Sequence, residues 1–581
     1  MTIAVTTVPS AVHLTKQNKH LKPIVMKKLI IILMAALPML AIAQSTVNIK
    51  VDSVGKLATQ IGDQKFKVAD LTVSGALNGT DLKLLQEIVT RTKTDKKNPD
   101  ECLVNTVDLS GITIVESNDK GGIKTQANEL PKGLFSGAKN LKKVVLPNSI
   151  NAISKGCFSG CTSLVDVTIP ASVTIIDVEA FQDCESLATI NLPAGLKTLG
   201  NEAFEGCKSL TAIQLPDGIK EITPQAFSKC KALKSINIPD GTKKIGGSAF
   251  KSCESITAIK LPSSVEEIES AAFDGCTDLE TIQMASVTKV GAMAFAGCKS
   301  LKAVSLDKIA SLGQAVFQNC TSLETVKMEG SLSDVNVAAF KGCSNLKDLS
   351  LPASLNEISS HAFEGCKSLE EVTIPASLAK IKDYAFQKCS SLKSVSFPNS
   401  LKSLGDHAFE DCSSLESITG TTLLDEIETY AFRNCGNLRK IVLPNTVRRI
   451  GRNAFCGCTM LSDINWPAEL KTIEDAAFEK CASLQSLNFA NGLKSIGGDA
   501  FKGCIQIISV DLPATVKELG GSAFQECTAL ATITINSGTP PSISGDTFKG
   551  THAVILIPKG SMAIYSADKK WSKVKGVKEN K

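Results

Sequence analysis

The chain contains little of what catalytic sites are usually built from. Its 581 residues include 5 histidines, 3 tyrosines and 2 tryptophans. His13 and His20 lie in the leader segment described below, and His361 and His407 occupy equivalent positions two repeat units apart, which we expect to be on a turn. No Ser, Cys or carboxylate accompanies these histidines in a spacing that would form a catalytic group. Phosphate-binding loops and metal-ligand motifs are also missing. The sequence therefore predicts no enzyme, no cofactor and no metal site.

A surplus of either charge is also missing. The formal net charge is +5, but residues 1–43 hold five of the 63 basic residues and no acidic one, so 58 basic residues face 58 acidic residues in the remainder. Nucleic-acid binding needs a basic surface, and we expect no nucleic-acid partner. The last stretch, 568–581, carries six lysines and two acidic residues. We interpret it as a solvated tail, with a polyanion-binding patch as the alternative.

Long apolar runs are absent except near the N-terminus. Met26, Lys27 and Lys28 precede an apolar run of 15 residues, 29–43, that ends in Ala-Ile-Ala. This order of a basic, an apolar and a small-residue segment is typical of a secretory signal peptide, and the run is short for a membrane span. We expect residues 26–43 to be a signal peptide and residues 1–25 to be a gene-model artefact or an extended leader. The mature protein would be secreted or surface-displayed without spanning a membrane.

The chain does contain a long internal repeat. A phenylalanine returns every 23 residues from Phe135 to Phe524, apart from two steps of 22 that end at Phe295 and Phe317, and Phe548 is a degenerate last copy. A fixed period of this size indicates a solenoid whose units bury their apolar sides against one another. Within each unit a short apolar stretch has the period of two expected for a strand. We expect one parallel sheet along one face and turns or short helices along the other.

The repeat also sets the expected domains. Terminal coils of a solenoid expose apolar edges and need caps. We expect an N-terminal cap at 44–130, the solenoid at 131–557, and a C-terminal cap with a basic tail at 558–581. Tyr565 and Trp571 would pack over the last coil, with a ligand platform as the alternative. The two 22-residue steps, together with missing prolines, predict a bend within 284–330.

Cysteine follows the same period. Seventeen of the 20 cysteines lie three residues after a repeat phenylalanine. Zinc sites need cysteines that converge on one point, whereas one cysteine per coil builds a line. We interpret the series as a column of small buried thiols, with disulfides between neighbouring coils as the alternative.

These positions recur together in a recognisable unit. The segment LPAGLKTLGNEAFEGCKSLTAIQL, residues 192–215, is very similar to the BspA-type leucine-rich repeats. The resemblance implies an α/β repeat solenoid of the right-handed leucine-rich type, without catalysis. It also implies a secreted or surface protein of an anaerobic Gram-negative bacterium. Better-known members of the family act as adhesins towards host matrix proteins or other cells.

The candidate binding surface is the strand face. The residues eight and ten positions after each phenylalanine flank the buried strand residue, and we expect them to face the concave side. Most are Ser, Thr or Asn and none is aromatic, whereas protein hot spots favour Trp, Tyr and Arg. Such a face would bind through many weak polar contacts, or it is merely a soluble sheet surface. The candidate residues are Asp166, Thr168, Thr189, Asn191, Ser235, Asn237, Ser394, Ser396, Ser417 and Thr419.

The leading hypothesis is an adhesin-type binder of host matrix or cell-surface proteins. A structural envelope protein without an external ligand is the alternative. A glycan-binding protein is possible but disfavoured, because so few aromatic residues lie in the repeats. The sequence does not determine the oligomeric state.

Overall fold

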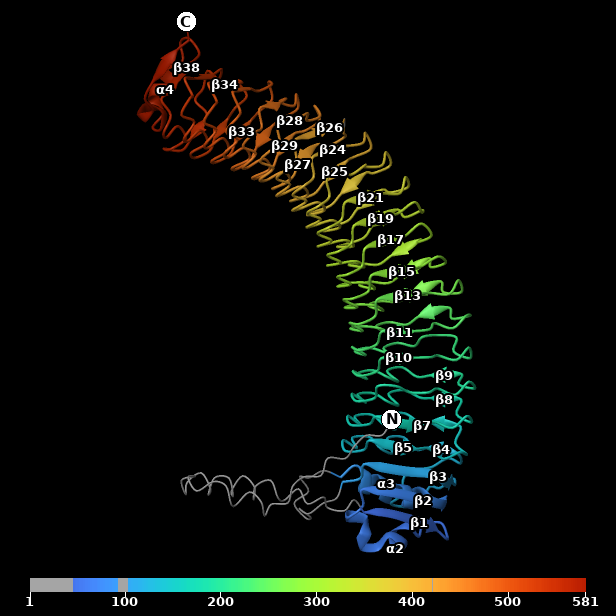
Figure 1. Cartoon of the computed structure of the whole chain (residues 1–581). Coiled ribbons are helices and arrows are strands. Elements are labelled where there is room, and N and C mark those ends of the chain that lie inside the picture. The colour runs from blue at the N-terminus through green and yellow to red at the C-terminus, as the bar shows by residue number, and fades with distance from the viewer. Residues whose placement is uncertain (1–44, 92–102, 421, 581) are drawn as a thin grey trace, which may run out of the picture.

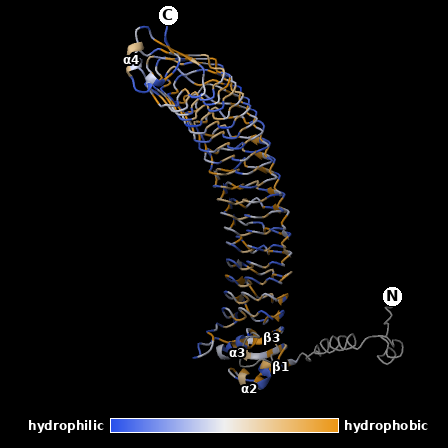
Figure 2. Ribbon diagram, turned by 90° about the vertical axis from the view of Figure 1, so that its left-hand side faces the viewer, coloured by the Kyte–Doolittle hydropathy of each residue, from blue (hydrophilic) through white to orange (hydrophobic). Residues whose placement is uncertain are grey.

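A computed structural model describes residues 45–91, 103–420 and 422–580 of the chain. The expected leader at 1–25, the expected signal peptide at 26–43 and Cys102 lie outside these residues. The described chain forms one arc of stacked coils that runs from the blue N-terminal end to the red C-terminal end (Figure 1). Figure 2 shows polar and apolar residues alternating around the coils along the whole arc, as expected when each coil buries one side of its strands.

The N-terminal end is built from longer elements than the coils. Its parallel sheet continues directly into the first coils in the order β1-β2-β3-β5-β7. The helix α3 begins with a capping box, in which the Asn78 side chain accepts from the Asp81 N–H and the Asp81 carboxylate accepts from the Asn78 N–H. The elements are β1 (Thr46–Val51), α2 (Leu57–Ile61), the 3-10 helix η1 (Gly62–Phe66), β2 (Asp70–Leu77), α3 (Gly79–Val89) and β3 (Thr106–Ile114).

Most coils contribute a first strand about nine residues after their phenylalanine, as the period-two pattern predicts, whereas the coils of Phe181 and Phe363 form no such strand. These strands pair in parallel with their equivalents in neighbouring coils, but the ladder is interrupted several times. They are β5 (Lys143–Val145), β7 (Asp166–Thr168), β10 (Ala212–Ile213), β11 (Ser235–Ile236), β13 (Ala258–Lys260), β15 (Thr281–Gln283), β17 (Ala303–Ser305), β19 (Thr325–Lys327), β21 (Asp348–Ser350), β24 (Ser394–Ser396), β26 (Ser417–Thr419), β28 (Lys440–Ile441), β30 (Asp463–Ile464), β32 (Ser486–Asn488), β34 (Ser509–Leu512), β36 (Thr532–Ile535) and β38 (Val554–Ile557).

Most coils also contain a second strand of two residues, and in the described part of the chain these strands form four parallel sheets that the sequence did not predict. Each second strand precedes the turn that holds the next phenylalanine. The second strands are β4 (Glu129–Leu130), β6 (Ala152–Ile153), β8 (Ile175–Ile176), β9 (Thr198–Leu199), β12 (Lys244–Ile245), β14 (Glu267–Ile268), β16 (Lys289–Val290), β18 (Ser311–Leu312), β20 (Asp334–Val335), β22 (Glu357–Ile358), β23 (Lys380–Ile381), β25 (Ser403–Leu404), β27 (Glu426–Ile427), β29 (Arg449–Ile450), β31 (Thr472–Ile473), β33 (Ser495–Ile496), β35 (Glu518–Leu519) and β37 (Ser542–Ile543).

The turns around the phenylalanines form the most regular column of the molecule. From Phe135 to Phe524, each phenylalanine N–H donates to the carbonyl of the residue that immediately precedes the next repeat phenylalanine, at 2.7–3.3 Å. Within a coil the turns close with short local bonds, such as Cys161 N–H to the Phe158 carbonyl at 3.1 Å. No helix forms within 131–557 among the described residues. The α/β description is therefore wrong for the repeats, because each turn ends after one or two local bonds.

The phenylalanine rings stack along the core. From Phe135 to Phe524 their centroids lie 5.1–5.7 Å apart. The steps that join Phe273, Phe295 and Phe317 are 5.3 and 5.4 Å and match the others. The ring stack is therefore regular through 284–330, and Figure 1 shows the coils continuing there without a break, so the bend stays a prediction. The missing residue falls in the turn after the first strand, outside the ring stack.

The cysteines that follow the phenylalanines form a second buried column. All 17 donate their Sγ–H to the carbonyl of the phenylalanine in the preceding coil, at 3.0–3.4 Å. Every cysteine of the described residues is a buried, unpaired thiol. The column of buried thiols is confirmed for these residues, and the disulfide alternative is not.

The C-terminal elements cover part of the last coil. They are α4 (Met562–Ala567), the 3-10 helix η2 (Trp571–Lys573) and β39 (Val577–Glu579), which pairs with β38. The Trp571 indole N–H donates to the Pro541 carbonyl at 2.7 Å, and the Tyr565 hydroxyl donates to the Ser537 carbonyl at 2.8 Å. Both aromatic side chains are buried over the last coil. Among the described residues, no helix is both long and apolar enough for a membrane span.

Candidate functional site

Four aromatic side chains form a column on the turn side of four successive coils. His361, Tyr384, His407 and Tyr430 each stand two residues before a repeat phenylalanine. Their ring centroids are 4.7, 4.5 and 4.5 Å apart in chain order, and consecutive rings are within 14° of parallel. We call these four residues the aromatic ladder.

All four ladder residues have a left-handed backbone conformation. Each of the four residues has a φ of 58–61°, and the next residue is a buried alanine. A left-handed residue here lets the chain reverse between the second strand and the buried phenylalanine. Equivalent positions in other coils have the same φ with alanine, glutamate or methionine, for example Ala338, Glu202 and Met293. The strained backbone is therefore a property of the repeat, and only the side chains distinguish the ladder.

The ladder lies on the inner side of the arc. Stacked, nearly parallel rings reflect the distance between coils at their own depth, and the ladder spacing of 4.5–4.7 Å is shorter than the 5.2–5.7 Å between the phenylalanines of the same coils. Coils that close up towards the turns and open towards the first strands curve with the turns inside. Figure 1 agrees, because β24, β26 and β28 lie nearer its outer edge than β25, β27 and β29. The prediction that the first-strand sheet is concave is wrong.

Polar side chains fix the two imidazoles. The Nδ1 atoms of His361 and His407 lie 2.6 and 2.7 Å from the Oε2 atoms of Glu364 and Glu410. Gln387 donates to the Glu410 carboxylate at 2.5 Å, and Arg433 Nη1 donates to it at 3.2 Å. The guanidinium of Arg433 also lies 5.3 Å from the Tyr430 ring centroid, within the range of a cation–π contact.

The electrostatics favour the ionised carboxylates. Burial acts to raise the pKa of Glu410, but the hydrogen bonds from His407, Gln387 and Arg433 outweigh burial, and the pKa lies below its usual value. At Glu364 burial likewise acts to raise the pKa, while Lys341, at 2.8 Å, and His361 lower it, with a net decrease. Each imidazole therefore faces a carboxylate anion, which holds the ring in one orientation.

The aromatic ladder is a partly exposed row of rings. The His361 and His407 side chains are 34% and 20% exposed, so they lie at a surface. The rings cover one another's faces, and the imidazole Nδ1 atoms are engaged by the glutamates, so the polar groups that remain are the tyrosine hydroxyls and the imidazole Nε2 atoms. A ladder of this kind offers a row of hydrogen-bonding groups with a fixed spacing.

The residues predicted from the sequence lie on the first-strand sheet, on the outer side of the arc. Seven of the ten are exposed, and Asp166, Asn237 and Ser417 are half-buried. Asp166 forms an ion pair with Lys143 at 2.9 Å. Asn237 donates to the Leu215 carbonyl at 2.8 Å and accepts from its N–H at 2.7 Å, so its amide joins two coils.

Part of this face is continuous. Ser394 and Ser396 in β24 stand beside Ser417 and Thr419 in β26 and line a shallow depression together with Glu371 and Thr373. Thr168, Thr189, Asn191 and Ser235 are exposed on earlier coils. The structure therefore keeps these residues on one face and separates them from the aromatic ladder.

The thiols in the described part of the chain are buried and apart from any cluster of metal-ligand residues. Burial raises the pKa of Cys161, Cys320 and Cys527 to about 12, so these thiols stay protonated at neutral pH. Within residues 45–91, 103–420 and 422–580 no group of three or more His, Cys, Asp or Glu side chains converges as a metal site would require.

The aromatic ladder was missed because its position looks variable. Two residues before each phenylalanine the sequence shows Gly, Glu, Gln, Ser, Ala, Met, Asn, Asp, His or Tyr, with no common chemistry. The available signal was His-Tyr-His-Tyr in four consecutive units, which contains two of the three tyrosines of the chain.

Comparisons with known proteins agree with the repeat. The family model described as BspA type leucine rich repeat region (6 copies) matches residues 128–257, 243–370, 310–439 and 425–555. No curated protein sequence matches the chain.

Solved structures that are similar to the chain include three bacterial proteins. A leucine-rich repeat protein from Bacteroides ovatus is 21% identical, with 82% of this chain and 92% of that chain covered and a TM-score of 0.35. A leucine rich cell surface protein from Faecalibacterium prausnitzii is 25% identical, with 55% and 86% covered and a TM-score of 0.33. A leucine rich repeat protein from T. pallidum is 27% identical, with 34% and 77% covered and a TM-score of 0.24.

Proposed function

Since the chain belongs to the BspA-type leucine-rich repeat family, we propose that it is a non-catalytic binding protein of the adhesin type. It is secreted or displayed on the surface of a Gram-negative anaerobe, and its partners are host matrix proteins or proteins of other cell surfaces. In this proposal residues 131–557 carry the binding surface, and residues 44–130 and 558–581 are the caps.

The observation that supports the proposal most is the aromatic ladder. Tyrosine and arginine are the side chains that dominate protein-binding hot spots, and Tyr384, Tyr430 and Arg433 lie together there. Stacking and the hydrogen bonds of Glu364 and Glu410 already order the ladder, so a partner would lose little side-chain entropy on binding. The first-strand face offers no comparable anchor.

The two alternatives differ in what they require of the ladder. A glycan that stacks on aromatic side chains needs free ring faces, whereas here the inner faces are covered by neighbouring rings at 4.5–4.7 Å. A structural envelope protein without an external ligand needs no ladder, and its surface substitutions would change no binding. The geometry therefore favours a protein partner.

The test is binding of the purified protein to an array of host matrix proteins, glycans and partner-cell surfaces. A ladder variant combines Tyr384→Ser, Tyr430→Ser and Arg433→Ser, and the matched variant on the other face combines Ser394→Ala, Ser396→Ala and Thr419→Ala. We expect saturable binding to a protein, weakened about tenfold or more by the ladder variant and unchanged by the other.

The contrary outcomes are distinct. A loss in the strand-face variant alone would move the site to the outer sheet. Saturable binding to a glycan alone would favour the lectin alternative. No binding to any member of the array would favour a structural envelope protein without an external ligand.

A further inference from the structure

The C-terminal cap leaves an opening beside the last repeat phenylalanine. The Phe524 and Phe548 centroids are 6.4 Å apart, which is wider than any earlier step of the stack. No further coil covers Phe548, and Trp571 approaches it at 5.7 Å with its ring tilted by 55°. Phe548 remains half-buried, whereas the earlier repeat phenylalanines are fully buried. The stack of rings is therefore open at this end.

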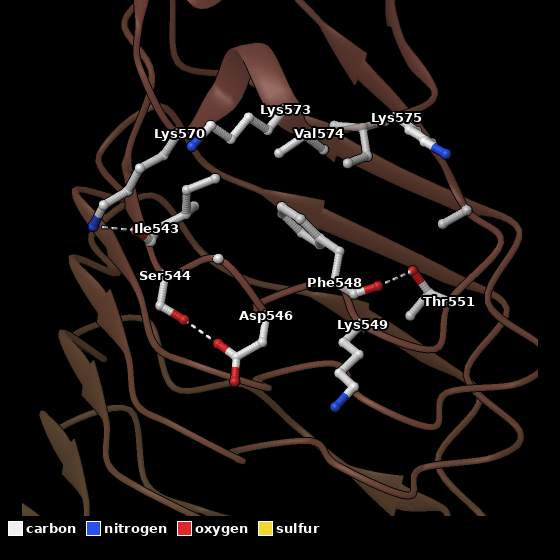
Figure 3. A pocket seen from close by; sticks show the side chains of 13 residues that line it. Ile543, Ser544, Asp546, Phe548, Lys549, Thr551, Lys570, Lys573, Val574 and Lys575 are labelled. Atoms are coloured by element: carbon white, nitrogen blue, oxygen red, sulfur yellow. Dashed lines mark hydrogen bonds between the residues drawn. The ribbon is translucent and has the colours of Figure 1, made fainter.

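This opening is a pocket that combines an apolar side with a polar rim. Its volume is about 580 Å³, within the roughly 300–1,000 Å³ range of small-molecule sites. Figure 3 shows Phe548 in the middle of the pocket, with Ile543 and Val574 beside it. Ala553 and Ile555 of the last coil complete the apolar lining. A ligand with an apolar body could therefore cover Phe548 in this space.

The rim of the pocket carries positive charge. Four lysines line it, namely Lys549, Lys570, Lys573 and Lys575, against the single acidic residue Asp546, which gives a difference of +3. The Lys570 ammonium donates to the Ile543 carbonyl at 2.7 Å, which places this charge at the edge of the apolar side. Asp546 accepts hydrogen bonds from the hydroxyls of Ser544 and Ser522. Among the described residues it forms no salt bridge with a rim lysine.

We propose that this pocket binds an amphiphilic anion, an unbranched alkyl chain that ends in one carboxylate. The alkyl chain would replace the missing coil against Phe548, and the carboxylate would meet the ammonium groups of Lys570 and Lys573, where charge-assisted hydrogen bonds are strongest. The site lies at the end of the arc, away from the aromatic ladder, and the inference does not depend on the proposed function.

The test uses dodecanoate below its micelle concentration and the whole protein, with affinity measured by calorimetry. We expect the double variant Lys570→Gln/Lys573→Gln to bind dodecanoate about tenfold or more weakly, because two charged contacts are removed. The control Lys569→Gln/Lys578→Gln makes the same change in net charge on the same cap but outside the pocket. It should stay within about twofold of the unchanged protein.

A second variant fills the pocket. Gly545 lines it, and a Cβ atom there would meet no atom within 4 Å, so Gly545→Trp adds volume without displacing the backbone. We expect this variant to abolish dodecanoate binding while circular dichroism and melting stay unchanged. Dodecanol and dodecyltrimethylammonium have the same alkyl chain without the carboxylate, and their affinity should be at least about tenfold weaker.

Three results would overturn the proposal. These are equal losses in the two lysine variants, equal binding of the neutral and cationic amphiphiles, and undiminished binding by Gly545→Trp. A concentration-dependent dimer in sedimentation that Gly545→Trp abolishes, without any dodecanoate binding, would instead assign the pocket to contact with a second copy of the chain.

Discussion

Each repeat phenylalanine is held between two identical neighbours. Phe340 is fully buried, and its ring centroid lies 5.4 Å from Phe317 and 5.5 Å from Phe363. Its removal would leave a cavity that borders two other coils. We predict that Phe340→Ala lowers the free energy of unfolding by about 3–5 kcal/mol, as measured by chemical denaturation.

Lys347→Ala in the same coil is the control for Phe340→Ala, because Lys347 is exposed, and it should change stability by less than about 0.5 kcal/mol. Hydrogen exchange should show faster opening in the coils of Phe317 and Phe363 and little change near either end. A stability change near zero for Phe340→Ala would contradict the stacked position of the ring.

At this scale the sequence predicted the interior well and the inner surface poorly. The phenylalanine and cysteine positions recur because every coil imposes the same burial on them, so the period alone identifies them. His361, Tyr384, His407 and Tyr430 occupy a position where the fold demands only a left-handed backbone. Their proximity follows from stacking coils about 4.8 Å apart, which brings residues 23 positions apart into contact.

The hydrogen bonds that join neighbouring coils differ in continuity between the turns and the strands. Hydrogen bonds between turns are unbroken from Phe135 to Phe524, whereas the first strands and the second strands are each divided into several shorter sheets. Neighbouring coils are closer together on the inner side of the arc than on the outer side. The sequence reports which residues are buried but not the difference in spacing between the two sides. The direction of curvature therefore could not be predicted from the pattern.

The polar side chains that hydrogen-bond beside the aromatic ladder also stabilise the coils. The Glu410 side chain is 8% exposed and is contacted by His407, Gln387 and Arg433 from three coils. We predict that Glu410→Gln lowers the free energy of unfolding at pH 7 by about 1–3 kcal/mol, because charge-assisted hydrogen bonds are lost. The exposed Glu416→Gln, in the same coil, is the matched control.

The sign of the pH dependence follows from the lowered pKa of Glu410, in which hydrogen bonds outweigh burial. A carboxyl with a lower pKa in the folded state stabilises the fold above its unfolded pKa, and this stabilisation is lost as the pH falls. The difference between Glu410→Gln and the unchanged protein should therefore be largest near pH 7 and shrink below about pH 4. A difference that is constant from pH 7 to pH 3 would contradict an ionised Glu410 carboxylate.

At the scale of the whole molecule, neighbouring coils depend on one another, and the buried thiols make this dependence sensitive to alkali. Burial raises the pKa of Cys161, Cys320 and Cys527 to about 12 from an ordinary value of 9.0. It also raises the pKa of other cysteines in the buried column, such as Cys184 and Cys343. Between these values the unfolded chain releases thiol protons that the folded chain retains. The unfolded state then binds fewer protons, so stability must fall as the pH rises.

We therefore predict a steep loss of stability above pH 9, with each buried thiol contributing up to about 1.4 kcal/mol per pH unit. The measurement is chemical denaturation at pH 8, 9, 10 and 10.5 under reducing conditions. Replacing Cys161, Cys320 and Cys527 by alanine should make the slope shallower by up to about 4 kcal/mol per pH unit, whatever the variant costs at pH 8, because distant sites add. Lysines and tyrosines titrate in both proteins and cancel in this comparison. Equal slopes in the two proteins would mean that these thiols ionise as readily in the folded chain as in the unfolded one, which their burial forbids.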